Sequence, residues 1–427
     1  MSEDKTREIE MAASGLKARV MVPGSKSITQ RALIAAALAS GRSRLETPLD
    51  SEDTRLLRQA LAELGILFEE RETHWEVEGG RGRISPCSRD LYMGNNGTGI
   101  RFLASLVALG AGRYVLTGTD RMSERPIEPL LASLRAWKAD AGSLRGNGCP
   151  PVKIVASGLE GGKTVLKAEK SSQFLSSLLL VGPYTRKPAV ISLDGGLVSR
   201  PYVDLTIEVM RAFGVPVEER DSSFFIPQKH YQATDYPVEG DASSASYFWA
   251  AAAVTGGSIT VENIPPDALQ GDARVADLLG DMGCTVKKDP GGVTVQGPES
   301  GGLKGIEVDM GKWPDMVPTI AVTAAFATGT TVIRNVAHLR IKETDRLKAV
   351  AAELGKMGAR VTELDDGLVV EGGHELHGAE IQTYDDHRIA MSFAVAGLRV
   401  PGVLIRNPEC VKKSFPGFWE LWQSLGR

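Results

Sequence analysis

The sequence has little cysteine and no long uncharged apolar run. Its 427 residues include four cysteines, far apart and without a CxxC pair: Cys87, Cys149, Cys284 and Cys410. This spacing excludes the common zinc and dithiol motifs and is typical of a reducing compartment. The first ten residues lack the apolar segment of a secretory signal, and the apolar stretch 250–254 is too short to span a bilayer. We therefore expect a cytoplasmic protein without a membrane partner, and a buried helix at 250–254.

The chain also lacks a strong excess of charge of either sign. Its 49 basic and 53 acidic residues give a net charge of -4, which provides no general attraction to nucleic acid. Any anion-binding site must therefore be built locally. Hydrophobic residues make up 42% and charged residues 24%, as in ordinary globular proteins, and the length favours two domains of similar size. We expect a monomer with no nucleic-acid partner.

A repeated unit runs through the chain. Short β-rich runs are centred on Leu45, Leu116, Ser192, Thr260, Ile333 and Leu404. By subtraction, their spacings are 71, 76, 68, 73 and 71 residues. Each run is followed by an amphipathic helix with apolar residues at steps of three and four, and we expect a glycine with positive φ to end each helix. The expected terminating glycines are Gly65, Gly142, Gly214, Gly283, Gly358 and Gly426.

Each unit then continues with further strands and a second helix of a different kind. Alternating strand pairs follow in most units, for example at 215–217 and 224–226. The second helices are expected to begin near Ser25, Asn95, Ser171, Ala242, Trp313 and Asp385. They are rich in Ala, Leu, Val and Ile on all sides, which is typical of buried helices. The pattern predicts three units per domain, with strands outside and apolar helices inside.

The two ends of the chain indicate where the domains divide. The sixth unit ends at its amphipathic helix, 418–425, and lacks its last strands. Strands expected at 8–11 and 17–22 can supply the missing part. We therefore predict one domain at 23–240 and a second domain that joins 1–22 to 241–427. Two crossings between the domains would form a hinge.

Polar side chains gather where the apolar helices begin. Ser, Thr, Asn and Asp are ordinary N-caps, and capping alone is a sufficient explanation for any single site. Capping does not explain the accompanying cations, because a cation at a helix N-terminus opposes the helix dipole. These cations are Lys26, Arg31, Arg101, Arg125, Lys342, Arg346, Arg388 and Lys413. A bound anion would account for them. No cluster of residues requires a metal or an organic cofactor, and we expect neither.

Several longer motifs resemble those of the 5-enolpyruvylshikimate-3-phosphate (EPSP) synthase family. In chain order they are PGSKS (23–27), GNNGT (94–98), RMSERP (121–126), SSQF (171–174), SRPY (199–202), DASSASYF (241–248), KETDR (342–346), DDHR (385–388) and KSFP (413–416). They cover nearly the whole chain in the order of the family.

The resemblance implies a fold and a reaction. The expected fold is an inside-out α/β barrel in each of two domains, built from three βαβαββ units per domain, with the active site in the cleft between the domains. The expected reaction transfers the enolpyruvyl group of phosphoenolpyruvate to the 5-hydroxyl of shikimate 3-phosphate and releases phosphate from a tetrahedral intermediate. Glyphosate is expected to compete with phosphoenolpyruvate.

The resemblance also implies roles for individual residues. The expected shikimate 3-phosphate ligands are Lys26, Ser27, Arg31, Ser171, Ser172, Gln173, Ser199, Tyr202, Asp315, His338 and Lys342. The expected phosphoenolpyruvate ligands are Lys26, Asn95, Gly97, Arg101, Arg125, Gln173, Arg346, Arg388 and Lys413. Because the hydroxyl must lose a proton while C3 gains one, we assign Asp315 to the hydroxyl and Glu343 with Lys26 to C3.

Two residues depart from the pattern of the family, and two other functions compete with this one. His338 stands where Asn is frequent, and Phe102 stands where Pro is common. The competing enzyme is UDP-N-acetylglucosamine enolpyruvyl transferase, which has Lys-Asn in place of Lys26-Ser27. The other alternative is a non-catalytic protein that binds phosphorylated metabolites, which would not need the carboxylates of Asp315 and Glu343.

Overall fold

The computed structural model describes residues 5–13, 15–298 and 302–425. Within them the chain forms two compact units. The central unit is Gly24–Val238, and the terminal unit combines Met1–Pro23 with Glu239–Arg427. The chain therefore leaves the terminal unit after its first strands and returns to it near Glu239.

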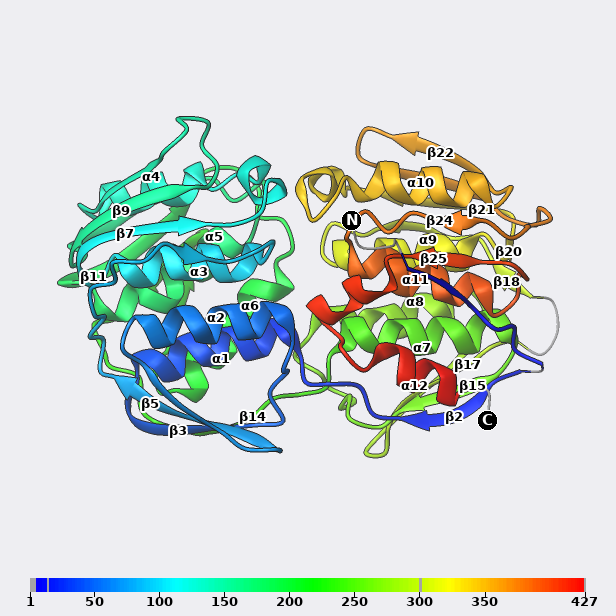
Figure 1. The fold of residues 1–427 in the computed structure, drawn as a ribbon, viewed down its shortest axis with the longest axis horizontal. Helices are drawn as coiled ribbons and strands as arrows, with labels where there is room; N and C mark the ends of the chain where they lie inside the picture. Colours follow the sequence, from blue (N-terminus) through cyan, green and yellow to red (C-terminus); the bar gives the residue numbers. More distant parts are fainter. Residues whose placement is uncertain (1–4, 14, 299–301, 426–427) are drawn as a thin grey trace. The chain divides into compact units, whose positions relative to one another are not determined.

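The central unit contains three four-stranded sheets of one topology (Figure 1). In each sheet the first two strands are parallel, and the third strand is antiparallel to both of its neighbours. In sheet order, the strands are β14 (Asp235–Pro237), β3 (Ser40–Glu46), β5 (His74–Gly80) and β4 (Leu67–Glu70); β6 (Leu91–Tyr92), β7 (Ala111–Thr117), β9 (Val152–Ser157) and β8 (Asp140–Ser143); and β10 (Gly161–Leu166), β11 (Lys187–Leu193), β13 (Ser223–Ile226) and β12 (Glu218–Arg220).

Two kinds of helix accompany these sheets. The amphipathic helices are α2 (Glu52–Glu63), α4 (Glu128–Ala136) and α6 (Pro201–Ala212), and the apolar helices are α1 (Lys26–Leu38), α3 (Gly97–Val107) and α5 (Gln173–Val181). Every residue of α1 from Ile28 to Leu38 is buried, because Arg31 is the only charged side chain in that stretch. The three apolar helices pack against one another. The prediction of buried helices in this part of the chain is confirmed.

In the described part of the terminal unit, two sheets repeat the four-stranded plan, a third sheet has three strands, and two further strands form a pair. Its sheets are β2 (Lys17–Val20), β15 (Ser258–Val261), β17 (Gly292–Gln296) and β16 (Thr285–Asp289); β19 (Glu307–Asp309), β21 (Thr330–Arg334), β23 (Gly367–Glu371) and β22 (Arg360–Leu364); β24 (Glu380–Ile381), β25 (Leu404–Arg406) and β1 (Thr6–Glu8); and the pair β18 (Leu303–Lys304) and β20 (Ala327–Thr328). Its apolar helices are α7 (Ala242–Thr255), α9 (Val317–Ala324) and α11 (His387–Gly397), and its outer helices are α8 (Val275–Asp281), α10 (Arg346–Lys356) and α12 (Phe418–Ser424). The predicted buried helix at 250–254 lies within α7.

The first two strands of the chain complete sheets made by its last part (Figure 1). Strand β2 pairs in parallel with β15, so it holds the edge position that β10 has beside β11. Strand β1 pairs antiparallel with β25, as β9 does with β7. Backbone groups of the two N-terminal strands thus satisfy ladders that would otherwise be open.

The predicted helix ends are confirmed at four of the six glycines. Gly65, Gly214, Gly283 and Gly358 follow their helices with φ of 90°, 85°, 107° and 89°. Gly426 lies outside the described residues. The prediction at Gly142 is wrong, because that glycine lies in β8.

Helix α4 ends instead at Ala136 with Trp137 as its C-cap, and the residue with positive φ is Lys138 (φ 73°). The Lys138 N–H donates to the Arg135 carbonyl and the Ala139 N–H donates to the Leu134 carbonyl, both at 3.0 Å. This pair of bonds defines the turn, so a lysine adopts the conformation that glycine favours.

Two predicted strand positions are also wrong. The strand expected at 215–217 is β12 at Glu218–Arg220, because the Val215 N–H is still bonded to the Met210 carbonyl at the end of α6. The strand expected at 8–11 is β1 at Thr6–Glu8, and the Ile9 side chain beyond it is buried in the core. No helix among the described residues has the length and apolar character needed to cross a bilayer.

The role of β2 can be tested with two neighbouring residues. Val20 is 5% exposed within the core of the terminal unit, whereas Met21 is 62% exposed. We expect Val20→Ala to lower the free energy of unfolding by roughly 1–3 kcal/mol through lost burial and a residual cavity. Met21→Ala, the control, should change it by less than about 0.5 kcal/mol. Thermal unfolding monitored by circular dichroism measures both variants, and equal melting temperatures would contradict a core role for β2.

Candidate active site

Side-chain caps begin four of the apolar helices, α1, α3, α7 and α11. In the central unit, the Ser25 hydroxyl accepts a hydrogen bond from the Ile28 N–H at 3.4 Å, and the Asn96 side chain accepts one from the Gly99 N–H at 2.8 Å. The N-cap of α5, Ser172, makes no such bond, but the preceding Ser171 accepts from the Gln173 N–H at 3.2 Å. Capping therefore occurs as the residue types predict. It leaves the nearby cations to be explained separately.

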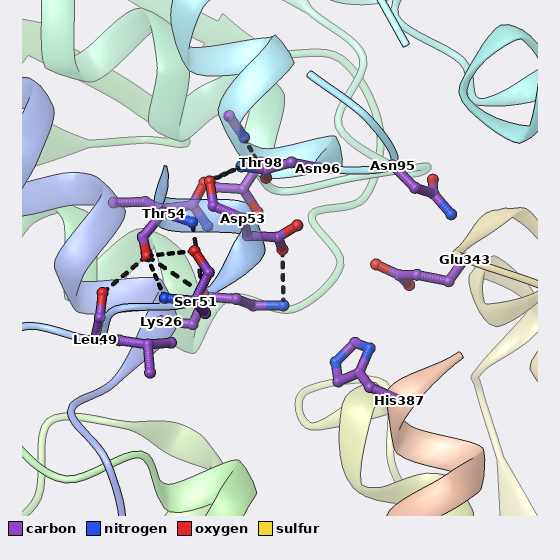
Figure 2. A network of polar contacts seen from close by, with 12 residues as sticks. Lys26, Leu49, Ser51, Asp53, Thr54, Asn95, Asn96, Thr98, Glu343 and His387 are labelled. Carbon is purple, nitrogen blue, oxygen red and sulfur yellow. Dashed lines mark hydrogen bonds and ion pairs between the residues drawn. The ribbon is translucent and has the colours of Figure 1, made fainter. Parts of the chain in front are cut away.

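Lys26, at the start of α1, forms an ion pair with a residue that the sequence analysis missed. Its Nζ lies 3.2 Å from Oδ2 of Asp53, and the side chains are 13% and 4% exposed. Asp53 lies in the first turn of α2, where Ser51 and Thr54 form a capping box. Figure 2 shows the pair beside the hydrogen bonds that join Thr54 to Ser51 and to Leu49. An acidic residue in a first helical turn is so common that its sequence context did not single out Asp53.

The N-termini of α3 and α5 are joined through arginine contacts. Arg125 donates from Nη1 to the carbonyl and the side-chain oxygen of Asn95, at 2.9 and 2.8 Å. Arg101 donates to the Gln173 side chain and, at 2.8 Å, to the Pro126 carbonyl. Gln173 in turn donates to the Thr98 hydroxyl at 2.9 Å. The structure thus brings five predicted ligands together: Asn95, Gly97, Arg101, Arg125 and Gln173.

Gly97 is required by the position of Arg125. A Cβ atom at residue 97 would overlap the guanidinium of Arg125. Arg125 is only 3% exposed, so its guanidinium has little room to move away. The absence of a side chain at Gly97 therefore allows Arg125 to lie against the first turn of α3.

Arg31 is more deeply buried than the prediction of a substrate ligand suggested. It is 1% exposed and donates to the Thr206 hydroxyl at 2.7 Å. It also donates to the carbonyls of Ser27, at 2.8 Å, and Tyr202, at 3.1 Å, and to the Ser176 hydroxyl at 3.4 Å. Burial lowers the pKa of the Arg31 guanidinium to about 10, which still leaves it charged at neutral pH. Arg31 therefore fixes α1 against α5 and α6.

Phe102 supports Arg31 from within the core. The Phe102 ring is fully buried, and the guanidinium carbon of Arg31 lies 5.3 Å from its centroid. Such a contact stabilises the cation through the electron-rich face of the ring. The remaining predicted ligands of this unit, Ser172, Ser199 and Tyr202, lie at the N-terminal ends of α5 and α6.

In the terminal unit, one arginine organises three carboxylates. Arg346, 1% exposed, donates from Nε to Asp386 at 2.7 Å and from Nη1 to Asp315 at 2.9 Å. Its Nη2 donates to Glu343 at 2.8 Å. Asp386 also caps α11 by accepting from the Arg388 N–H at 3.0 Å. We call Arg346, Asp315, Glu343 and Asp386 the carboxylate cage. Asp386 was missed as an arginine ligand because capping explained it.

Asp315 contacts two further cations. Arg388 donates to its second oxygen at 2.9 Å, and Nζ of Lys342 lies 3.8 Å away. Burial raises the pKa of the Asp315 carboxyl, but Arg388, Lys342 and Arg346 together hold that pKa well below its usual range. Asp315 is at the second position of the single-turn helix η4 (Pro314–Met316), whose N-cap is Trp313. The ionised state of Asp315 therefore rests on these cations.

His338 and Lys413 are also buried in this unit. His338, in helix η5 (Ala337–Ile341), is 8% exposed, and its Nε2 has no hydrogen-bond partner among the described residues. Burial, and secondarily Lys342, lowers the pKa of His338 to about 4, so the imidazole is neutral at pH 7. Lys413, in helix η6 (Pro408–Lys413), is 6% exposed. A neutral imidazole nitrogen is suited to a hydroxyl group.

No cluster of three His, Cys, Asp or Glu side chains arranged to hold a metal ion occurs in the described part of the chain. The carboxylates of the cage surround a guanidinium. The arrangement therefore provides paired cations for anionic groups and a set of ionisable groups for proton transfer.

Comparison with known proteins gives consistent results. A model of the family described as EPSP synthase (3-phosphoshikimate 1-carboxyvinyltransferase) matches residues 11–422. The chain is 43% identical over 415 residues to the 3-phosphoshikimate 1-carboxyvinyltransferase of Syntrophobacter fumaroxidans, covering 96% of this chain and 98% of the relative. It is 42% identical over 414 residues to the enzyme of that name from Methanothermobacter thermautotrophicus, covering 97% of both.

The fold is similar to that of a solved structure. Superposition on EPSP synthase from Acinetobacter baumannii gives a TM-score of 0.81 at 30% identity and covers 99% of this chain and 98% of that chain. Similarity therefore extends over nearly the full length in both sequence and structure.

The state of His338 predicts a pH dependence of stability. Between about pH 6.5 and 4 the unfolded chain binds a proton at this position that the folded chain does not, so stability falls as the pH drops through this window. Above about pH 6.5 the penalty is absent. We expect His338→Asn to lose less thermal stability than the wild type between pH 7 and pH 4.5. Thermal unfolding at several pH values measures this.

The exposed His377 provides the control. His377→Asn should follow the wild-type pH profile. A His338→Asn profile parallel to that of the wild type would mean that His338 titrates normally.

Proposed function

The chain belongs to the EPSP synthase family, and on this premise we propose how its residues carry out the family's reaction. The protein transfers the enolpyruvyl group of phosphoenolpyruvate to the 5-hydroxyl of shikimate 3-phosphate and releases phosphate. The assignment of residues rests on the carboxylate cage. Its ionised Asp315 is bonded to Arg346 within the cage and to Arg388 outside it. The similarity to 3-phosphoshikimate 1-carboxyvinyltransferases favours this acceptor over a UDP-sugar, and activity over simple binding.

We propose that both units contribute to one active site, and that each unit is an inside-out barrel of three βαβαββ units. The packing of three apolar helices within each unit, with sheets around them, supports the second statement. Cations at helix starts in both units support the first, because both substrates are polyanions.

Shikimate 3-phosphate is proposed to bind mainly to hydroxyl and amide groups of the central unit. These residues are Ser27, Ser171, Ser172, Gln173, Ser199 and Tyr202, with Lys342 and the neutral His338 from the terminal unit. Arg31 supports this set, since it bonds the carbonyls of both Ser27 and Tyr202. Its four hydrogen bonds to the protein leave at most one N–H for the substrate.

Phosphoenolpyruvate is proposed to bind to the cations. Its ligands are Lys26, Asn95, Gly97, Arg101, Arg125, Gln173, Arg346, Arg388 and Lys413. Planar guanidinium groups match the carboxylate and phosphate oxygens, and Lys26 and Lys413 supply compact positive charge for the departing phosphate.

The chemistry proceeds by addition and elimination. Asp315 accepts the proton of the 5-hydroxyl while the hydroxyl oxygen bonds to C2 of phosphoenolpyruvate. Glu343 with Lys26 delivers a proton to C3 of phosphoenolpyruvate. The tetrahedral intermediate then returns one C3 proton to Glu343 with Lys26 and expels phosphate, which restores the double bond. The proton held by Asp315 leaves with the phosphate. When a substrate anion engages Arg388 and Lys342, these cations stabilise Asp315 less, which makes it a stronger base. Substrate binding thus prepares the base for its role.

Activity and the role of Asp315 are tested together. We expect the protein to release phosphate from phosphoenolpyruvate with shikimate 3-phosphate and not with UDP-N-acetylglucosamine. Asp315→Asn keeps the shape but removes the proton acceptor, so turnover should fall by at least roughly 100-fold. Calorimetric affinity for shikimate 3-phosphate should stay within about tenfold, because Asp315 is one of many ligands.

The control is Asp309→Asn, an exposed carboxylate in β19. It should retain wild-type turnover. If Asp315→Asn kept the wild-type turnover, the role of general base would be assigned to Glu343 and not to Asp315.

Gly97→Ala tests the phosphoenolpyruvate site. The added methyl group overlaps the Arg125 guanidinium and displaces it. Loss of a hydrogen bond to a charged group should raise KM for phosphoenolpyruvate roughly tenfold or more, and weaken glyphosate inhibition similarly. Gly142→Ala is the control, because no atom lies within 4 Å of its new methyl group. If KM for phosphoenolpyruvate were unchanged in Gly97→Ala, Arg125 would not be a ligand of phosphoenolpyruvate.

A further inference from the structure

The turn that leads into α11 has an unfavourable backbone conformation. Tyr384 and Asp385 are consecutive residues with φ of 53° and 54°, and neither is a glycine. Side chains with a Cβ atom disfavour this region, so two such residues in succession require support from their surroundings. The next residue, Asp386, is the one that binds Arg346 and caps α11. The shape of this turn therefore sets the position of the carboxylate cage.

A buried carboxylate on α10 supports the turn. Glu353 has no exposed surface, and it accepts hydrogen bonds from the Tyr384 hydroxyl at 2.6 Å and from the Gln382 N–H at 3.0 Å. It also accepts from Lys356 at 2.7 and 2.9 Å. Partial burial and the Glu353 carboxylate raise the pKa of Tyr384 to about 12, so its hydroxyl keeps the proton that it donates.

One helix thus holds the turn at two points. Arg346, the first residue of α10, binds Asp386 at the end of the turn. Glu353, two helical turns later on the same buried face, binds Gln382 and Tyr384 at its beginning. Two anchors on a rigid helix fix the direction in which the chain enters α11. The proposed mechanism does not use Glu353 or Tyr384 directly.

We propose that Glu353 and Tyr384 are positioning residues for phosphoenolpyruvate. They hold the turn in the conformation that fixes Asp386, and through Asp386 they orient the Arg346 guanidinium and place Arg388 at the start of α11. This rests on the proposed role of Arg346 and Arg388 as phosphoenolpyruvate ligands. If Glu353 had only a structural role, as the partner of Lys356, its replacement would lower stability without changing KM for phosphoenolpyruvate.

Tyr384→Phe removes only the hydroxyl that donates to Glu353. We expect KM for phosphoenolpyruvate to rise by at least fivefold, about the effect of losing one charge-assisted hydrogen bond, while kcat changes less. Affinity for shikimate 3-phosphate, measured by calorimetry without phosphoenolpyruvate, should stay within about twofold, since most of its proposed ligands lie outside this turn. Glu353→Gln should raise the same KM. The double variant should resemble the more affected single variant, because both act through one contact.

Lys356→Gln is the matched control, because it removes the one partner of Glu353 that lies outside the turn and leaves the bonds to Gln382 and Tyr384 in place. Its KM for phosphoenolpyruvate should equal the wild-type value. An unchanged KM in Tyr384→Phe, in a wild-type background that releases phosphate, would overturn the positioning role and leave the proposed function intact. Equal losses of affinity for both substrates would also overturn it. A wild-type protein without activity would instead refute the proposed function.

Discussion

The burial of one positive charge constrains most of the terminal unit's chemistry. Arg346 is 1% exposed, and an unpaired guanidinium at that depth would destabilise the fold strongly. Its donors are satisfied by carboxylates from three separate segments: η4, the turn before α10, and the start of α11. Neutralising this arginine therefore fixes where Asp315, Glu343 and Asp386 lie. The same contacts that stabilise the protein hold the proposed base ionised beside the proposed anion ligands.

The fold could be predicted well where a local pattern had one physical meaning. Apolar helices such as 245–254 have no polar face, so burial was the only stable arrangement. The sixth unit lacks its last strands, and two additional strands were expected near the N-terminus. The pairing of these strands with the last part of the chain could therefore be predicted. The predictions failed where backbone bonding decides the outcome. Lys138 takes a conformation expected of glycine because two C-terminal hydrogen bonds of α4 require it. Val215 continues the end of α6 for the same reason.

The candidate site was predictable in its residue types and less so in its contacts. The family resemblance supplied Asp315, Arg346 and Arg388, whose proximity the structure shows. Asp53 was not singled out, and Asp386 was not identified as an arginine ligand, because an acidic residue near a helix start is usually a cap. The sequence also does not show which cation a carboxylate contacts. Arg31 is more deeply buried than expected of a substrate ligand. It is bonded to Thr206 and Tyr202, which lie far from it in the sequence. Long-range partners of this kind depend on tertiary packing.

The placement of β1 and β2 has a consequence for synthesis on the ribosome. Thr6–Glu8 precedes the central unit in the chain, and its partner strand Leu404–Arg406 follows that unit. The central unit lies between them as an uninterrupted segment, so it can fold while the N-terminal strands still wait for their sheets. A waiting strand is exposed to pairing with other chains. Both strands are short and charged, TRE and KARV, which disfavours such pairing during the delay. The charged side chains of these two strands thus protect their backbone edges until the partner strands have been made.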